Sequence, residues 1–217
     1  MIVNKSNYSI DHFLHSPVIT GRYKSNGIER KRHLYQCQQF VSSDGLLLEF
    51  GVFKGKTLNQ ICQYWPDRTV FGFDSFVGLP EHWFIDGEAG LSIRANKFDL
   101  TNSDPIDYPA NSILVRGWYE DSIDPWLERN AGDIALLHID CDLYSSTKTV
   151  LTKLNSRIIR GTVIAFDEFY PWANSNPYSE WPNHEYKALR EWVEQFDREF
   201  EVLLHNSYQQ TSIRILR

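Results

Sequence analysis

A regular alternation along the chain is the feature that most constrains its fold. Short, continuous apolar runs are separated by longer stretches of mixed apolar and polar spacing. Runs of the first kind are typical of strands buried on both faces of a parallel sheet. We expect strands at residues 46–50, 70–73, 113–116, 134–139 and 162–166, and helices at 57–65, 121–130 and 146–157, with Ser122 or Ser146 as N-caps. The pattern predicts an α/β fold with right-handed crossovers.

The C-terminal part departs from this alternation. A long helical pattern at about 183–200 is followed by two strand-like runs, 201–205 and 212–216, joined by the polar segment 206–210. Two such runs are typical of a β-hairpin. We therefore expect one domain with a seven-stranded, mostly parallel sheet whose last strand is antiparallel. Residues 1–45 are expected to form a helical extension to a core at 46–217, and the basic helix at 28–40 to present a solvated face.

Composition excludes several classes of protein. The net charge of −6 argues against a partner rich in phosphate, so we expect no nucleic acid. No apolar run approaches the roughly 18 residues of a membrane helix, and the N-terminus lacks the apolar core of a signal peptide. We expect a cytoplasmic protein without a membrane partner, and a homo-oligomer is among the expectations. The 3 cysteines show no CxxC spacing and predict neither disulfides nor a zinc site.

Ligands of an open parallel sheet bind beyond the carboxyl ends of its strands, so the residues after each strand are candidates. Glu49, Gly51, Gly55 and Thr57 follow the first strand at the entry to a helix, where glycine permits close approach and free N–H groups bind anions. The G-x-G-x-x-G dinucleotide signature and the G-x-x-x-x-G-K-[ST] signature are absent. Asp74 ends the second strand 25 residues after Glu49, near the roughly 20 expected for a carboxylate that binds ribose hydroxyls.

Two acidic clusters follow neighbouring strands, Asp140 with Asp142 and Asp167 with Glu168. Carboxylates that lie close together raise one another's pKa unless a cation lies between them. Oxygen ligands favour Mg²⁺ over zinc, so the clusters indicate a magnesium site, with helix caps and surface acids as the alternative. We interpret His138, in the middle of a strand, as a core histidine.

Five segments resemble the successive motifs of the macrocin O-methyltransferase family, in order and with compatible spacing. They are residues 48–57, 71–80, 117–122, 137–148 and 166–170. The stretches G-F-D-S-F-V-G-L-P and H-I-D-C-D-L-Y are the most specific of them. The members are S-adenosylmethionine-dependent enzymes that methylate sugar hydroxyls of natural products and need Mg²⁺. The resemblance thus implies the Rossmann-like fold of class I methyltransferases.

The resemblance also implies roles for individual residues. Cofactor contacts would come from Glu49, Gly51, Gly55, Thr57, Asp74, Ser75, Gly117 and Trp118. The magnesium ligands would be Asp140, Asp167 and Glu168, although the family usually has aspartate where this chain has Glu168. The longer glutamate stem would shift the metal ion or leave this carboxylate outside its coordination shell.

The predicted reaction is methyl transfer to a hydroxyl of a sugar or sugar-bearing small molecule. Asp140 and Asp142 are the first candidates for the base, and His184 and Glu185 the second. Two loops rich in aromatic residues, 81–96 and 170–183, are expected to bind the acceptor. Two alternatives stay open: an oxidoreductase that binds NAD or a nucleotide-sugar, and a non-catalytic binding protein built on a cofactor fold.

Overall fold

Parallel strands buried on both faces form the centre of the molecule. The computed structural model describes residues 2–15, 18–19, 26–42, 44–87, 90–171, 178–206 and 208–217. The parallel strands are β3 (Leu46–Phe50), β4 (Val70–Asp74), β7 (Ser112–Arg116), β8 (Ile134–Ile139) and β9 (Val163–Phe166). Side chains alternate between two apolar clusters, one on each face: Val163 and Ala165 join one, and Ile164 and Phe166 the other. This alternation explains why the strands are apolar throughout.

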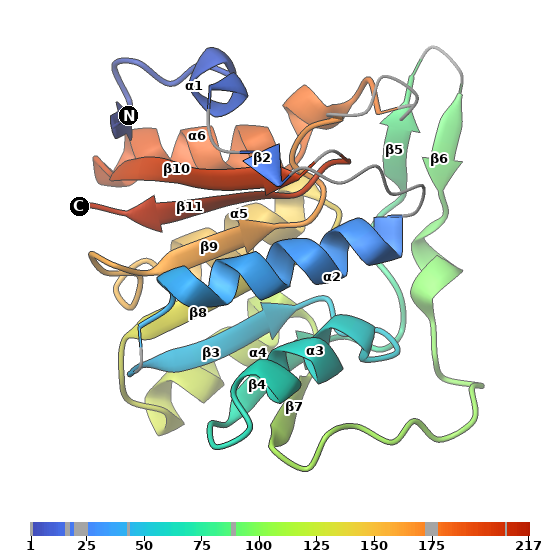
Figure 1. Ribbon diagram of the computed structural model, residues 1–217. Coiled ribbons are helices and arrows are strands. Elements are labelled where there is room, and N and C mark those ends of the chain that lie inside the picture. The colour runs from blue at the N-terminus through green and yellow to red at the C-terminus, as the bar shows by residue number, and fades with distance from the viewer. Residues whose placement is uncertain are drawn as a thin grey trace.

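The C-terminal hairpin enters the sheet as predicted. It consists of β10 (Glu199–Asn206) and β11 (Thr211–Ile215), and β11 is antiparallel to both β10 and β9. The strand order is β1-β10-β11-β9-β8-β3-β4-β7, with β2 also beside β10 (Figure 1). The mostly parallel sheet with an antiparallel last strand is confirmed.

The sheet is wider than expected, because the described part of the chain contributes nine strands to it rather than seven. The additional strands, β1 (Ile2–Asn4) and β2 (Val18–Ile19), come from the N-terminal segment that was predicted as wholly helical. They are too short to leave a periodic pattern in the sequence, and their pairing with β10 is a contact between distant segments.

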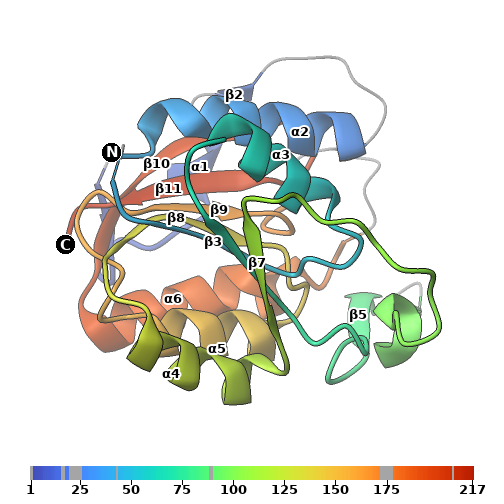
Figure 2. The same ribbon diagram turned by 90° about the horizontal axis from the view of Figure 1, so that it is seen from below.

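Helices cover both faces of the sheet (Figure 2). One face carries α2 (Asn26–Cys37) and α3 (Lys56–Tyr64), and the other carries α4 (Tyr119–Arg129), α5 (Tyr144–Lys153) and α6 (Glu185–Phe196). The short helix α1 (Asp11–Leu14) packs beside β10, and the 3-10 turn η1 (Gln38–Phe40) follows α2. The prediction of Ser122 and Ser146 as N-caps was wrong, because the extended backbone of Trp118 and Leu143 starts the helices earlier.

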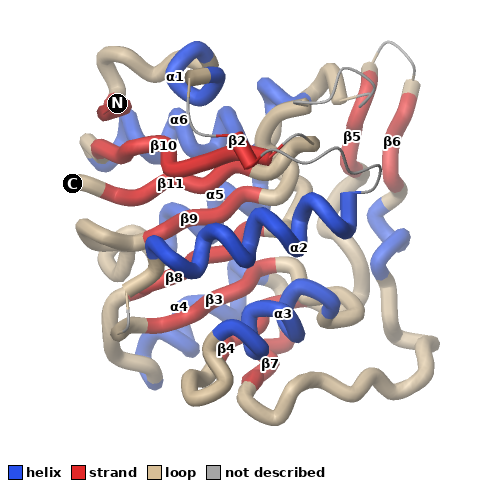
Figure 3. Tube along the Cα trace, viewed as in Figure 1, coloured by secondary structure: helices blue, strands red, loops and turns tan. Residues whose placement is uncertain are grey.

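A second, two-stranded sheet lies between β4 and β7 in the chain. It pairs β5 (Trp83–Asp86) with β6 (Leu91–Ile93), and the 3-10 turn η2 (Ala95–Phe98) follows. Figure 3 shows this hairpin beyond the carboxyl ends of the parallel strands. Trp83 packs there against Leu143 and Tyr178. Tyr178 precedes the 3-10 turn η3 (Trp181–Asn183) in the chain. Among the described helices, none combines the length and the apolar character that a membrane span requires.

Candidate functional site

Backbone hydrogen bonds hold the loops after the parallel strands in a row. The amides of Gly51, Asp140 and Asp167 each donate to a carbonyl near the end of a neighbouring strand, at 3.0, 2.8 and 3.0 Å. The amide of Gly117 donates in the same way to Asp74, at 3.0 Å. The parallel ladder therefore continues past the strands and brings the predicted residues to one edge of the sheet.

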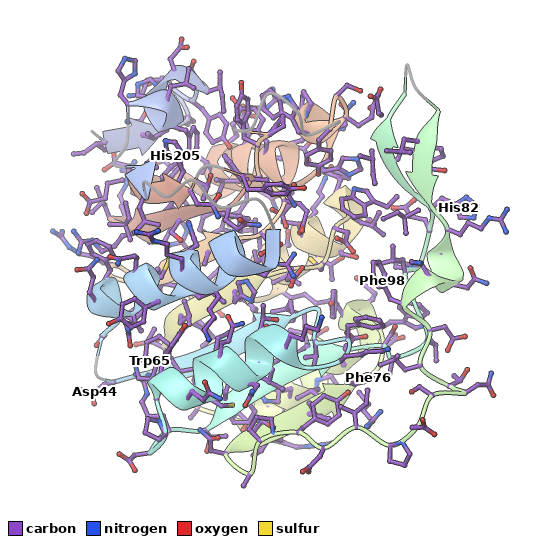
Figure 4. The ribbon with its side chains drawn as sticks, turned by 45° about the vertical axis from the view of Figure 1, so that its right-hand side comes forward. Asp44, Trp65, Phe76, His82, Phe98 and His205 are labelled. Atoms are coloured by element: carbon purple, nitrogen blue, oxygen red, sulfur yellow. The ribbon has the colours of Figure 1, made fainter. Side chains whose placement is uncertain are left out.

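A cavity of about 900 Å³ opens at this edge. Most of the predicted site residues line it: Gly51, Thr57, Asp74, Ser75, Gly117, Trp118, Asp140, Asp142 and Glu168. In Figure 4 the labelled Phe98 lies on the β5–β6 side of this region, and its ring contacts that of Phe53 edge-on at 5.2 Å. The contact joins η2 to the loop after β3, and both residues line the cavity.

The loop after β3 depends on two glycines. Gly51 has φ of +99°, and a Cβ atom there would lie 1.7 Å from the carbonyl oxygen of Asp140. Glycine is thus required by the approach of this loop to the end of β8, which places the two loops against each other. Gly55 has φ of +71° and precedes α3, where a Cβ atom would lie 2.8 Å from the ring of Tyr108. Gly55 shapes the loop from outside the cavity lining.

Asp74 connects the loops on either side of it. Its Oδ2 accepts from the amide of Phe53 and its Oδ1 from the amide of Phe76, both at 2.7 Å. Burial raises the pKa of Asp74, and these two hydrogen bonds act in the opposite direction. A carboxylate has about four lone-pair sites, so the oxygens keep acceptor capacity towards the cavity.

Glu49 lies behind the cavity rather than in its wall. The side chain is fully buried, and its Oε1 lies 3.1 Å from Nδ1 of His138. Burial alone would lower the pKa of His138, but the hydrogen bond and charge of Glu49 raise it overall. Glu49 and His138 form a buried polar pair between two central strands, and the cofactor contact expected of Glu49 is not part of this geometry.

Four carboxylates converge at the ends of β8 and β9. Oxygens of Asp140, Asp142 and Glu168 lie within 4.8 Å of one another, and oxygens of Asp140 and Asp167 lie equally close to a nitrogen of His138. The predicted ligands Asp140, Asp167 and Glu168 thus belong to two overlapping groups that share Asp140. In the described part of the chain, Oδ1 of Asp167 and Oε2 of Glu168 are buried without a hydrogen-bond donor. These unpaired hard oxygens fit a divalent cation such as Mg²⁺.

Burial and mutual repulsion change the acidity of this cluster. Burial, as the largest cause, raises the pKa of Asp140 to about 7 and raises that of Glu168 and Asp142 well above its usual range. Burial would also raise the pKa of Asp167, but the adjacent guanidinium of Arg30 lowers it overall. The cluster therefore needs positive charge to stay ionised.

Arg30 of α2 supplies positive charge that sequence reasoning missed. Its Nη1 lies 3.3 Å from Oδ2 of Asp140, and its Nη2 pairs with Asp167 and lies 3.2 Å from Oε1 of Glu168. The interpretation of the basic helix as a solvated face was wrong for Arg30 and for the buried His33. Their spacing of three residues, continued by Leu34 and Cys37, was the available signal of an inward-facing stripe.

Two more side chains near Glu168 were missed or differently placed. Nε2 of Gln209, in the β10–β11 turn, donates to Oε1 of Glu168 at 3.1 Å, and no sequence motif marks this residue. Glu185 is buried, and its Oε2 accepts from the amide of Glu168 at 3.0 Å. Both side chains fix the position of Glu168.

His184 lies outside the cavity lining. Its Nε2 lies 2.8 Å from the carbonyl oxygen of Phe84, and its ring stacks on Tyr178. The structure therefore connects His184 to the β5–β6 hairpin. Of the two expected acceptor loops, residues 88–89 and 172–177 lie outside the described residues, while Trp83 and Tyr178 line the cavity.

Comparisons with known proteins agree with this architecture. The family model described as Macrocin-O-methyltransferase (TylF) matches residues 20–198. The chain is 26% identical over 162 residues to 8-demethyl-8-(2,3-dimethoxy-alpha-L-rhamnosyl)-tetracenomycin-C 4'-O-methyltransferase of Streptomyces olivaceus. It is 28% identical over 165 residues to demethyldecarbamoylnovobiocin O-methyltransferase of Streptomyces niveus. Each match covers 66% of this chain and 61% of the relative, so the chain spans less than two thirds of their length.

Solved structures show the same fold. A calicheamicin methyltransferase superposes with a TM-score of 0.61 at 24% identity, covering 87% of this chain and 78% of that chain. The O-methyltransferase NovP superposes with a TM-score of 0.57 at 25% identity, covering 88% and 81%. The Rossmann-like fold expected of class I methyltransferases is therefore confirmed.

Proposed function

Because the chain belongs to the macrocin O-methyltransferase family, we propose that it transfers a methyl group from S-adenosylmethionine to a hydroxyl group. The acceptor is a sugar or a sugar-bearing small molecule, as the rhamnosyl group in the name of the Streptomyces olivaceus relative indicates for that enzyme's own substrate. One observation carries the proposal: six of the eight predicted cofactor residues line a single cavity that the acidic cluster also borders. Donor and acceptor would then meet in one site, which methyl transfer requires.

The cofactor would lie along the loops after β3, β4 and β7. Gly51 offers backbone without a side chain, and Asp74 is held by two amides with acceptor capacity left for ribose hydroxyls. Trp118 lines the cavity beside Gly117 at the start of α4, where a ring would pack on the adenine.

We assign the metal and proton-transfer roles to the carboxylates. Asp140, Asp167 and Glu168 are the proposed ligands of Mg²⁺, which when bound acts as a Lewis acid towards the acceptor hydroxyl. Asp142 is the proposed base, because it lines the cavity while the ion pairs of Arg30 go to the other three carboxylates. Its φ of +63°, unusual for a residue other than glycine, is a further sign of a constrained functional position.

Calorimetry tests the cofactor first. We expect S-adenosylmethionine and S-adenosylhomocysteine to bind and NAD not to bind. Binding of NAD alone would favour the oxidoreductase alternative, and binding of none of the three would favour the non-catalytic alternative.

Methyl transfer to a panel of glycosylated acceptors tests the metal. Chelator should abolish turnover, and Mg²⁺ should restore it better than Ca²⁺, whose larger and less regular shell orients the acceptor poorly. Asp140→Asn and Asp167→Asn should abolish turnover with cofactor affinity changed by no more than a few fold. Full activity in chelator would refute the metal requirement. Proton removal by a carboxylate without metal would then be the remaining mechanism.

A further inference from the structure

The guanidinium of Arg30 contacts one oxygen of each carboxylate that we propose as a metal ligand. It reaches Oδ2 of Asp140, Oδ2 of Asp167 and Oε1 of Glu168, one oxygen from each proposed ligand. A guanidinium and a divalent cation both bind carboxylates through these lone pairs. The two cations would also repel each other at this distance. Oδ1 of Asp167 and Oε2 of Glu168 have no hydrogen-bond donor among the described residues, but a metal ion bound there would lie beside Arg30 and compete with it for the same three carboxylates.

The rest of α2 is anchored independently of Arg30. Side chains alternate along the strands, so Ser212 of β11 faces α2 on the same side of the sheet as Asp167. Its Oγ lies 2.7 Å from Nε2 of His33 and 2.8 Å from Sγ of Cys37. Together with the buried Leu34, these contacts fix the C-terminal turns of the helix, and Arg30 fixes the turn before them.

Arg30 also has a path away from the cluster. Figure 1 shows α2 crossing in front of β8 and β9, with its N-terminal end towards the carboxyl edge of the sheet. The side chain of Arg30 is 24% exposed and lines the cavity, whereas those of Asp167 and Glu168 are 0% and 3% exposed. The carboxylates are thus held in place, while the long arginine side chain borders open space.

We propose that Arg30 is a built-in countercation of the carboxylate cluster, and that a divalent cation displaces it and loosens the adjoining turn of α2. This inference rests on the metal site of the proposed function. In the absence of metal, Arg30 neutralises part of the buried negative charge and so stabilises the folded protein around the carboxylate cluster. When metal enters, the guanidinium moves towards the cavity, and α2 stays attached through His33, Leu34 and Cys37.

Metal binding to the wild type and four variants provides the test. Mn²⁺ affinity is measured by electron paramagnetic resonance, with Mg²⁺ as competitor, for the wild type, Arg30→Gln, Arg30→Lys and the matched control Lys31→Gln. Lys31 is the exposed neighbour on the same helix, so its variant removes the same charge outside the cluster. We expect Arg30→Gln to bind about tenfold more tightly or better, because a competing charge is gone. Lys31→Gln and Arg30→Lys should stay within about threefold of the wild type, and Asp140→Asn should lose binding.

Two further measurements cover the case in which Arg30→Gln is poorly folded without metal. Its melting temperature in chelator should fall well below that of the wild type and should recover with Mg²⁺, whereas the wild type should change little. In the wild type, hydrogen exchange over residues 26–32 should become faster on addition of Mg²⁺, while exchange over residues 33–37 and over α3 stays constant.

The outcomes distinguish a failure of the proposed displacement of Arg30 from a failure of the proposed metal site. Equal Mn²⁺ affinity of the wild type, Arg30→Gln and Lys31→Gln would overturn displacement and leave the metal site intact. Absence of metal binding in all variants that still bind S-adenosylhomocysteine would overturn both displacement and the metal site, but not the cofactor site. Slower or unchanged exchange over residues 26–32 would count against loosening of this turn of α2.

Discussion

The buried charges of this protein differ in role because they differ in partners. Glu49 lies one residue before the end of β3 and Asp74 ends β4, yet Glu49 pairs with His138 beneath α2, while Asp74 binds two loop amides beside the cavity. Glu49 is level with Gly72, two residues before Asp74 on the neighbouring strand, so both side chains point to the same face and Asp74 lies nearer the edge of the sheet. Position along the strand therefore decides which of the two carboxylates reaches the cavity. A test of Asp74 must therefore distinguish binding of the cofactor from stabilisation of the neighbouring loops.

Asp74→Ala should lower the affinity for S-adenosylmethionine more than tenfold, on the order of 2–3 kcal/mol, because hydrogen bonds to a charged acceptor are lost. Calorimetry measures the effect. Asp99→Ala is the control, since Asp99 also accepts a loop amide, from Thr101 at 2.8 Å, but lies outside the cavity lining. Equal affinities of the two variants would remove Asp74 from the cofactor site.

His33 should make stability depend on pH. Burial is the largest cause that lowers its pKa to about 3 in the folded protein, whereas the unfolded chain binds the proton near pH 6.5. Neutral His33 thus contributes stability above about pH 6.5, and this contribution is lost as the pH falls towards 3. Between about pH 7 and pH 5 the loss is about 2 kcal/mol.

Urea unfolding at these two pH values measures that loss. His33→Gln keeps a polar group near Ser212 but does not titrate, so its stability should fall by about 2 kcal/mol less than that of the wild type over the same interval. Identical pH dependence of the two proteins would show that other groups, such as the carboxylates, cause the whole effect.

At the scale of elements, the site depends on loops that keep the register of the sheet. Gly51→Ala combines a strained positive φ with a Cβ atom 1.7 Å from the carbonyl of Asp140, so it should cost at least about 3 kcal/mol of unfolding free energy. Gly161→Ala is the matched control: its φ of +97° is nearly the same, but nothing lies within 4 Å of its Cβ position. It should cost only about 1–2 kcal/mol in the same urea titration. Similar losses in both variants would contradict the packing argument.

The elements of the parallel sheet could be predicted from the sequence because burial on both faces gives them an unbroken apolar signal. The runs at 46–50 and 134–139 match β3 and β8 to the residue, and the other three parallel strands differ by one residue at an end. The β5–β6 hairpin was missed. Trp83, Ile85 and Ile93 pack against a small apolar cluster, but the apolar Phe84 and Leu91 are about half exposed, so these short strands show no clear alternation of apolar and polar residues.

The site was predictable where it follows strand ends and unpredictable where it depends on contacts across the fold. Gly51, Asp74 and the carboxylates after β8 and β9 could be predicted as site residues from their positions at strand ends, because parallel strands end at a common edge of the sheet. Arg30 lies 110 residues before Asp140 in the chain and reaches it only because α2 packs over β9 and β10. No local sequence pattern predicts a contact between residues so far apart in the chain.

At the scale of the whole molecule, the N-terminal segment adds an edge strand to the sheet and buried side chains to its core. Val3 and Phe13 are fully buried in the same apolar cluster as Phe169 and Phe200, and Tyr8 donates to the carbonyl of Tyr186 at 3.0 Å. The rings of Phe13 and Phe169 lie 4.8 Å apart. We therefore expect residues 2–15 to fold with the core at 46–217 as one cooperative unit rather than as a separable extension.

Two neighbouring residues test this expectation. Phe13 is fully buried and Leu14 is 46% exposed, although both belong to α1. Phe13→Ala should lower the unfolding free energy by about 3–5 kcal/mol through lost burial and the cavity left behind, and Leu14→Ala should change it by no more than about 0.5 kcal/mol. Circular dichroism of the helices and tryptophan fluorescence should give coincident urea transitions for both variants. A Phe13→Ala protein with wild-type stability, or a separate early transition, would show that the N-terminal segment folds apart from the sheet.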